Sequence, residues 1–171
     1  MTRGKKILAG RHTARMDAPF VVFMIGLRIN RLVAVRHWWP TLMEMPRMLK
    51  ALESDPESGL LARRTVWYWR GVEVIQYWRS FEHLERFARD TKGPHWPAWK
   101  RFYQTIRDDG PVGIWHETYQ VEPGGFETLY GNMPTFGLGA AGQSIPLADL
   151  RRARRRLADG GGPADSPPPP P

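Results

Sequence analysis

The segment TVWYWRGVEVIQYW, residues 65–78, constrains the fold of this chain more than any other stretch of its sequence. β-Branched and aromatic residues dominate it, and Arg70-Gly71 in its middle predicts a tight turn between two strands. Side chains alternate between the two faces of a strand, so each face of the first strand carries apolar or aromatic residues. These are Val66 and Tyr68 on one face, and Trp67 and Trp69 on the other. The sequence therefore predicts a hairpin covered on both sides.

The segments around this hairpin predict the remaining elements of one domain. Residues 19–29 are apolar enough for a buried strand, and residues 112–121, VGIWHETYQV, predict the last strand. Residues 31–54 predict a helix that Pro40 and Pro46 kink or split. Residues 81–90 and 95–109 predict two further helices. The order is strand, helix, strand, strand, helix, strand, which is the βαββαβ pattern of a ferredoxin-like α+β domain.

An antiparallel sheet with helices on one side leaves its other face bare. Because both faces of the predicted hairpin are apolar, the bare face also needs a cover. A second copy of the same sheet provides the simplest cover, so we expect a homodimer that forms a dimeric α/β barrel.

Charge divides the chain into three parts. The formal net charge is +8, with Arg3, Lys5, Lys6, Arg11 and Arg15 making residues 1–15 a basic arm of +5. Residues 145–171 carry five Arg and three Asp before a run of prolines, a composition typical of a disordered tail. Residues 16–144, the predicted α/β-barrel domain, keep only +1. A nearly neutral domain argues against specific nucleic-acid binding, although basic ends permit weak contact with RNA or a membrane surface.

The chain has no cysteine, which excludes disulfides and thiolate chemistry. No apolar run is long enough to predict a transmembrane segment, and no secretory signal precedes the domain. These features predict a cytoplasmic protein.

Four motifs resemble a known family. They are QYWRSFEHLERFARD, HWPAWKRF, VGIWHETY and YGNMPTFGLG, and they occur in order between Gly10 and Ala140. Together they resemble bacterial relatives of a fungal monooxygenase of the fumagillin pathway. This resemblance implies a dimeric α/β barrel, a fold shared by monooxygenases, chlorite dismutases and aldoxime dehydratases, some of which use haem b and some no cofactor.

His116 lies in the middle of the last predicted strand, with Ile114 on the same face and Trp115 and Glu117 on the other. One interpretation makes it a catalytic base or the axial ligand of haem iron, facing a pocket between sheet and helices. The other makes it a buried structural histidine, hydrogen-bonded to Gln76, Glu73 or Tyr68 across the sheet. Glu117 is expected to pair with Arg79 or Arg28.

His95 begins the helix whose buried side carries Trp99, Phe102 and Ile106. That position suits a base or a haem ligand at the mouth of a pocket, and it equally suits a structural bond to the preceding backbone.

The aromatic residues suggest a pocket for a flat apolar ligand, although each one alone fits an ordinary core equally well. Trp99 and Trp115 are the expected cofactor contacts. The expected substrate pocket comprises Trp67, Tyr68, Trp69, Phe102, Asn132, Met133 and Phe136, the last three forming a lid.

Three functions remain open. The first is a monooxygenase that acts on a hydrophobic small-molecule substrate, with His116 and His95 as acid–base or iron-ligating groups. The second is a haem-dependent enzyme similar to aldoxime dehydratases. The third is a module that binds haem or a small ligand without turnover.

Overall fold

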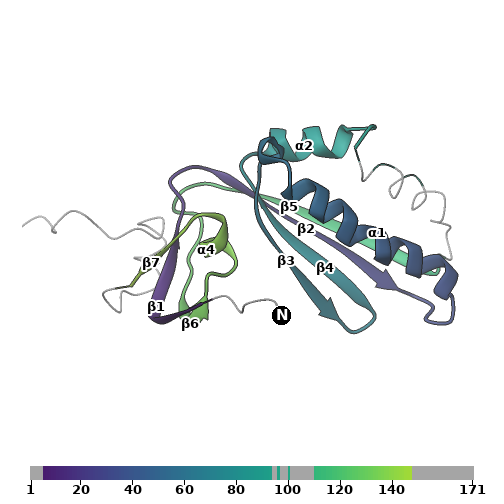
Figure 1. The fold of residues 1–171 in the computed structure, drawn as a ribbon, viewed down its shortest axis with the longest axis horizontal. Helices are drawn as coiled ribbons and strands as arrows, with labels where there is room; N and C mark the ends of the chain where they lie inside the picture. The colour runs from purple at the N-terminus through teal and green to yellow at the C-terminus, as the bar shows by residue number, and fades with distance from the viewer. Residues whose placement is uncertain (1–5, 94–95, 97–99, 101–109, 148–171) are drawn as a thin grey trace, which may run out of the picture. The chain divides into compact units, whose positions relative to one another are not determined.

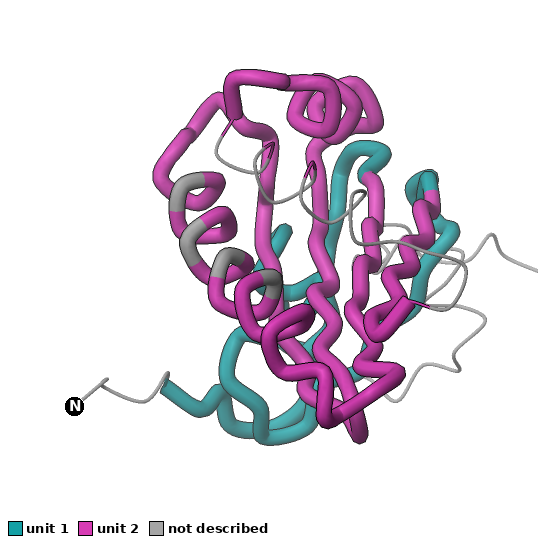
Figure 2. Tube along the Cα trace, turned by 90° about the vertical axis from the view of Figure 1, so that its right-hand side faces the viewer, with its two compact units in different colours: residues 1–20, 120–171 teal, residues 21–119 magenta. Residues whose placement is uncertain are grey.

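The computed structural model describes residues 6–93, 96, 100 and 110–147. The chain forms two compact units (Figure 2). Unit 2 comprises Val21–Tyr119, and unit 1 combines Met1–Phe20 with Gln120–Pro171. The division into residues 1–15, 16–144 and 145–171 that the sequence suggested stays a prediction, and residues 1–5 and 148–171 lie outside the described residues.

Unit 2 contains a four-stranded sheet with helices on one side (Figure 1). The strand order is β3-β4-β2-β5, so the first strand of the βαββαβ pattern lies between the third and the last. This arrangement confirms the ferredoxin-like α+β fold. The elements are β2 (Phe20–Ile29), α1 (Val35–Glu53), the short 3-10 helix η1 (Pro56–Ser58), β3 (Leu60–Tyr68), β4 (Gly71–Trp78), α2 (Phe81–Arg89) and β5 (Val112–Val121).

The predicted hairpin exists, but its turn lies one residue earlier than expected. Tyr68 pairs with Gly71, so Trp69 and Arg70 form the turn. Arg70 has φ 67°, a left-handed conformation that costs a non-glycine residue free energy. Its guanidinium offsets that cost by donating to the carbonyl oxygens of Ile29 (3.0 Å) and Asn30. These hydrogen bonds connect the hairpin tip to the end of β2.

The core of unit 2 lies between the sheet and its helices. One cluster joins Leu27, Ile29, Val72 and Val112 to residues of α1, namely Trp38, Leu42 and Met45. A second joins Val21 and Trp78 to Leu52 of α1 and Leu84 of α2. Trp78 is fully buried, and its indole nitrogen donates to Gln76 (2.9 Å). Helix α1 covers this face as one segment and runs through Pro40 and Pro46, so it is not split there.

Helix α2 begins where the sequence predicts an N-cap. The Ser80 side chain accepts a hydrogen bond from the backbone N–H of His83, and Glu82 lies in the first turn. The hydrogen bond between Glu82 and Ser80 lowers the pKa of the Glu82 carboxyl below its ordinary value.

Unit 1 holds a second sheet that the sequence did not predict. It has the order β6-β1-β7, built from β1 (Ile7–Arg15), β6 (Tyr130–Pro134) and β7 (Gln143–Pro146), with the short helix α4 (Leu138–Ala141). Most of the expected N-terminal arm is therefore a strand. Thr128 forms two hydrogen bonds with β1. The Thr128 hydroxyl accepts from the backbone N–H of Ala14 (2.7 Å), and the Thr128 carbonyl oxygen accepts from the Thr13 hydroxyl (2.9 Å).

Candidate functional site

Strand β5 places His116 on the side of the sheet that faces the helices. Ile114, two residues earlier, packs against the cluster formed by Leu27, Val72 and their neighbours, and alternation puts His116 on the same face. The imidazole lies beside the ring of Phe23, with 5.8 Å between the ring centroids. His116 is exposed. The expectation that a mid-strand histidine must be buried was wrong, because β5 leaves the cluster after Ile114.

Of the partners expected for a buried His116, one lies on the same face but is bonded to another residue, and two lie on the opposite face. Gln76 is buried on the helix-facing side, where it accepts from Trp78. Tyr68 and Glu73 lie on the opposite face, because they are in register with Gly71 and Gly26 rather than with the core residues. The imidazole of His116 is therefore accessible for a ligand.

The opposite face of the sheet, which we call the open face, is built from aromatic rings lying over glycines. A Cβ atom at Gly26 would come within 2.4 Å of the Trp115 indole nitrogen, so the ring of Trp115 lies directly against this glycine. That nitrogen donates to the Tyr68 hydroxyl (3.4 Å), which donates to the carbonyl oxygen of Leu27 (3.0 Å). Trp115 and His116 thus lie on opposite faces, so one pocket cannot use both as we expected.

A carboxylate lies between these rings. Glu73 is directly in register with Gly26 on one side and with Val66 on the other. Its Oε1 atom is buried and has no hydrogen-bond partner. A buried carboxylate oxygen is costly unless a donor reaches it, so the open face of a single chain is incomplete at this point. The sequence suggested Glu73 only as a partner for His116. The isolated Gly26 in an apolar strand was the available signal of a close contact on this face.

Glu117 and Tyr119 form a polar pair on the open face. The Tyr119 hydroxyl donates to a Glu117 carboxylate oxygen (2.5 Å). This bond, together with the negative charge of Glu117, raises the pKa of Tyr119 above its ordinary value. Arg28 donates to Asn30 (2.8 Å), and the expected pairing of Glu117 with Arg79 or Arg28 stays a prediction.

The aromatic residues of the hairpin do not form a wall around His116. Trp67 is 68% exposed and Trp69 is 84% exposed, while Tyr68 points to the open face. Trp67 is in register with Val72 but belongs to an edge strand, where nothing in the described residues covers it.

The residues of the expected lid belong to unit 1. Asn132 is in β6, where its side-chain oxygen accepts from the backbone N–H of Gly10 (2.9 Å), and Met133 pairs with Leu8. Phe136 is 36% exposed. Asn132 and Met133 therefore help to hold β1 and β6 together. His95, Trp99 and Phe102 lie outside the described residues.

Two hollows open at the ends of α1. One, of ≈ 760 Å³, is lined at the start of the helix by Arg31, residues 33–37 and Pro111. The other, of ≈ 580 Å³, lies at the end of the helix beside η1 and α2, with His83 in its lining. In the part of the chain that the structure describes, His116 lines neither hollow. No group of three potential metal-ligating side chains occurs among these residues, and no described helix is long and apolar enough to cross a membrane.

Fold and site define an α+β protein of the ferredoxin-like class, with an accessible histidine on one face of its sheet. The family model for monooxygenase af470-like proteins matches residues 20–138, and the chain belongs to this family. It is 32% identical over 149 residues to monooxygenase af470 of Aspergillus fumigatus, a match that covers 80% of this chain.

The same fold occurs in an aldoxime dehydratase whose crystal structure contains butyraldoxime. The two structures superpose with a TM-score of 0.60 at 18% sequence identity, over 94% of this chain. The chain spans about half the length of both proteins, 50% of the fungal monooxygenase and 46% of the dehydratase.

Proposed function

We propose that this protein is a monooxygenase that acts on a hydrophobic small molecule, with His116 as its acid–base group or iron ligand. The observation that carries the proposal is the position of His116, solvent-accessible on the helix-facing side of β5 with its ring beside Phe23. The family supports the reaction class, since the fungal relative is a monooxygenase.

Haem is a cofactor that this position would accept. Imidazole is a common axial ligand of haem iron, and an aromatic ring next to it suits a flat apolar macrocycle. His116 would hold the iron, with His95 as the second candidate, and the haem would supply the iron that activates oxygen. In the cofactor-free form of the reaction, the neutral imidazole of His116 would instead remove a proton from a substrate carbon, which then reacts with oxygen.

The test is the absorption spectrum of the purified protein during titration with haem. We expect a Soret band in the wild type that shifts or disappears in one of two variants, His116→Ala or His95→Ala. His12→Ala serves as the control, because His12 lies in β1 of unit 1 and should leave the spectrum unchanged. A band that survives in both site variants would contradict ligation by either histidine, and no haem uptake would leave the cofactor-free reaction or a small-ligand-binding module.

A second candidate function follows from the likeness to the aldoxime dehydratase. Dehydration of an aldoxime consumes no oxygen, whereas a monooxygenase must consume it. Oxygen uptake with hydrophobic substrates, measured beside nitrile formation from an alkyl aldoxime, therefore separates the two enzymes. Stable binding without either product would identify a binding module.

We further propose that a second copy of the chain covers the open face. One observation supports it: the Oε1 atom of Glu73 is buried on this face and has no hydrogen-bond partner. Sedimentation velocity at micromolar concentration should show a dimer, and Trp115→Lys should give a monomer. A monomeric wild type would contradict this assembly. A cytoplasmic location remains a prediction.

A further inference from the structure

The end of unit 2 opposite α2 carries the tip of the β3–β4 hairpin and the connection from β2 to α1 (Figure 1). Many apolar side chains are exposed there. At this end, the hairpin tip and the connection from β2 to α1 meet. The Ile29 backbone N–H donates to the Arg70 carbonyl oxygen (2.7 Å), and the Arg70 guanidinium donates back to Ile29 and Asn30. We call this region the tip, and its exposed apolar residues are Leu32, Val33, Val35, Trp39, Trp67 and Trp69.

The exposure at the tip is high. Val33 is 93% exposed and Trp69 84%, and Leu32, Val35 and Trp39 are each about half exposed, at 48%, 48% and 50%. Single exposed apolar residues are ordinary, but a group of this size at one end of a domain indicates a contact surface. Tryptophan is the residue most typical of the boundary between lipid and water, because its ring is apolar while its N–H stays hydrated.

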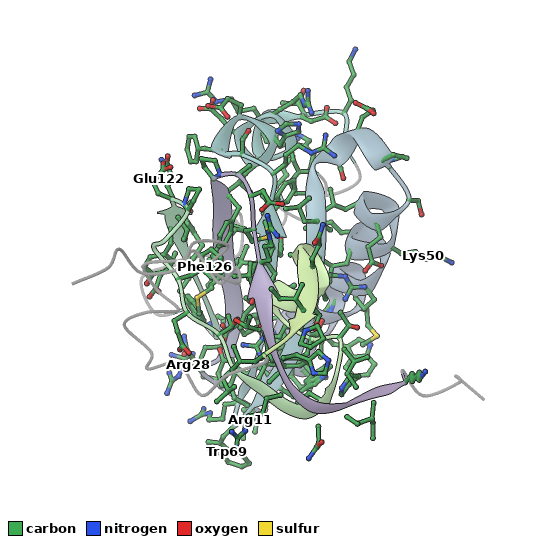
Figure 3. The ribbon with its side chains drawn as sticks, turned by 90° about the vertical axis from the view of Figure 1, so that its left-hand side faces the viewer. Arg11, Arg28, Lys50, Trp69, Glu122 and Phe126 are labelled. Atoms are coloured by element: carbon green, nitrogen blue, oxygen red, sulfur yellow. The ribbon has the colours of Figure 1, made fainter. Side chains whose placement is uncertain are left out.

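Among the described residues of the tip, the charged side chains all have the same sign. Residues 28–43 and 67–71 contain Arg28, Arg31, Arg36 and Arg70 and no acidic residue. Arg28 and Trp69 lie at the same end of the unit (Figure 3). The hollow at the start of α1 is lined by two of these arginines, Arg31 and Arg36, together with the aliphatic Val33 and Val35. Cationic and apolar groups therefore occur side by side.

From this combination we infer that the tip binds the surface of an anionic lipid bilayer. The apolar residues would enter the boundary of the acyl chains, while the arginines remain at the level of the lipid headgroups. A second copy of the chain fits less well, since a twofold contact through the tip would bring four arginines against four others. The inference does not depend on the proposed reaction or on which face of the sheet forms a dimer.

The test is sedimentation of the full-length chain with two kinds of vesicle, phosphatidylcholine alone and phosphatidylcholine mixed with phosphatidylglycerol. We expect the wild type to bind the mixed vesicles. The double variant Val33→Ser/Trp69→Ser should bind about tenfold more weakly, and Arg36→Gln about fivefold more weakly. The basic ends of the chain are the same in all proteins compared, so their contribution cancels.

The matched control is Phe81→Ser/Arg89→Gln on α2, at the opposite end of the unit. Phe81 is 39% exposed, and the Arg89 side chain is 79% exposed, so this variant removes the same kinds of group. It should bind like the wild type. Equal binding of wild type and tip variants would overturn the inference, as would no binding of the wild type or binding without phosphatidylglycerol. A tip variant that changes only the sedimentation of the free protein would instead assign the tip to contact between two copies.

Discussion

The two faces of the four-stranded sheet differ in how they are completed. On the helix-facing side, Val21, Leu27, Val74 and Trp78 are buried by α1, α2 and the neighbouring strands of the same chain. On the open face, aromatic rings lie against glycines and the buried Glu73 Oε1 atom has no hydrogen-bond partner. A face that its own chain completes serves stability, whereas an incomplete face predicts a partner. His116 stands at the margin of the completed face, where the apolar cluster ends.

The largest expected effect of a substitution lies in the completed face. Trp78→Ala should lower the free energy of unfolding by about 3–5 kcal/mol, because it removes a fully buried indole and leaves a cavity. Chemical denaturation measures this loss. The control is Trp67→Ala on the neighbouring strand, whose side chain is 68% exposed and should cost far less. Similar losses in both variants would show that the hairpin contributes to the core as a whole.

The next effect tests the close contact on the open face. Gly26→Ala should lower the free energy of unfolding by about 1–3 kcal/mol, because the new methyl group would collide with the Trp115 ring. Trp115→Ala in the same chain should recover part of that loss. Gly131→Ala is the matched control, since no atom lies within 4 Å of the position of its added Cβ. If Gly26→Ala lowered the free energy of unfolding by the same amount in a chain with Trp115→Ala, the new methyl group would collide with a residue other than Trp115.

A smaller loss of stability is expected at the N-cap of α2, on the helix-facing side of the sheet. Ser80→Ala should destabilise the protein by about 1 kcal/mol through loss of the N-cap of α2. It should also raise the pKa of Glu82 toward its ordinary value of 4.5, which NMR titration measures. Because the folded protein lowers this pKa, the contribution of Glu82 to stability is present above the ordinary value and declines as pH falls below it. Ser80→Asp keeps the cap and should retain most of the stability.

The smallest effect concerns protonation on the open face. Glu117 raises the pKa of Tyr119 above its ordinary value of 10.0, so this phenol should lose its proton later than an unperturbed tyrosine. Its stabilising bond is present below the ordinary pKa and is lost as pH rises through the higher value. Tyrosinate absorbance should show one late step that Tyr119→Phe removes and Glu117→Gln moves to lower pH. An unchanged titration in Glu117→Gln would contradict the assignment of Glu117 as the cause of the raised Tyr119 pKa.

The sequence predicted unit 2 well because its strands carry strong local signals. Apolar β-branched runs identified β2, β4 and β5, and Ser80 identified the start of α2. The sequence did not predict the sheet of unit 1, because the apolar run in β1 is only Ile7-Leu8-Ala9 and is followed by Gly10 and the polar Arg11-His12-Thr13. Its partners lie more than 100 residues away, as the hydrogen bond between Thr13 and Thr128, 115 positions apart, illustrates. Such long-range pairing is not encoded in any local pattern.

The candidate site was predictable only in part. Alternation correctly placed His116 and Trp115 on opposite faces, but it could not show how far the apolar cluster extends along β5. His116 was therefore expected to be buried. The position of Glu73 beside Gly26 and Val66 on the open face follows from the register of three strands. No local sequence pattern specifies that register.

The most direct test of this account compares two neighbouring residues of β5 that point to opposite faces. Ligand titration, followed by absorption with haem and by fluorescence with apolar ligands, should be measured for His116→Ala and for Glu117→Ala. We predict that His116→Ala weakens or abolishes binding, while Glu117→Ala binds like the wild type. Equal binding by both variants, or a loss confined to Glu117→Ala, would contradict the assignment of the ligand site to the helix-facing side.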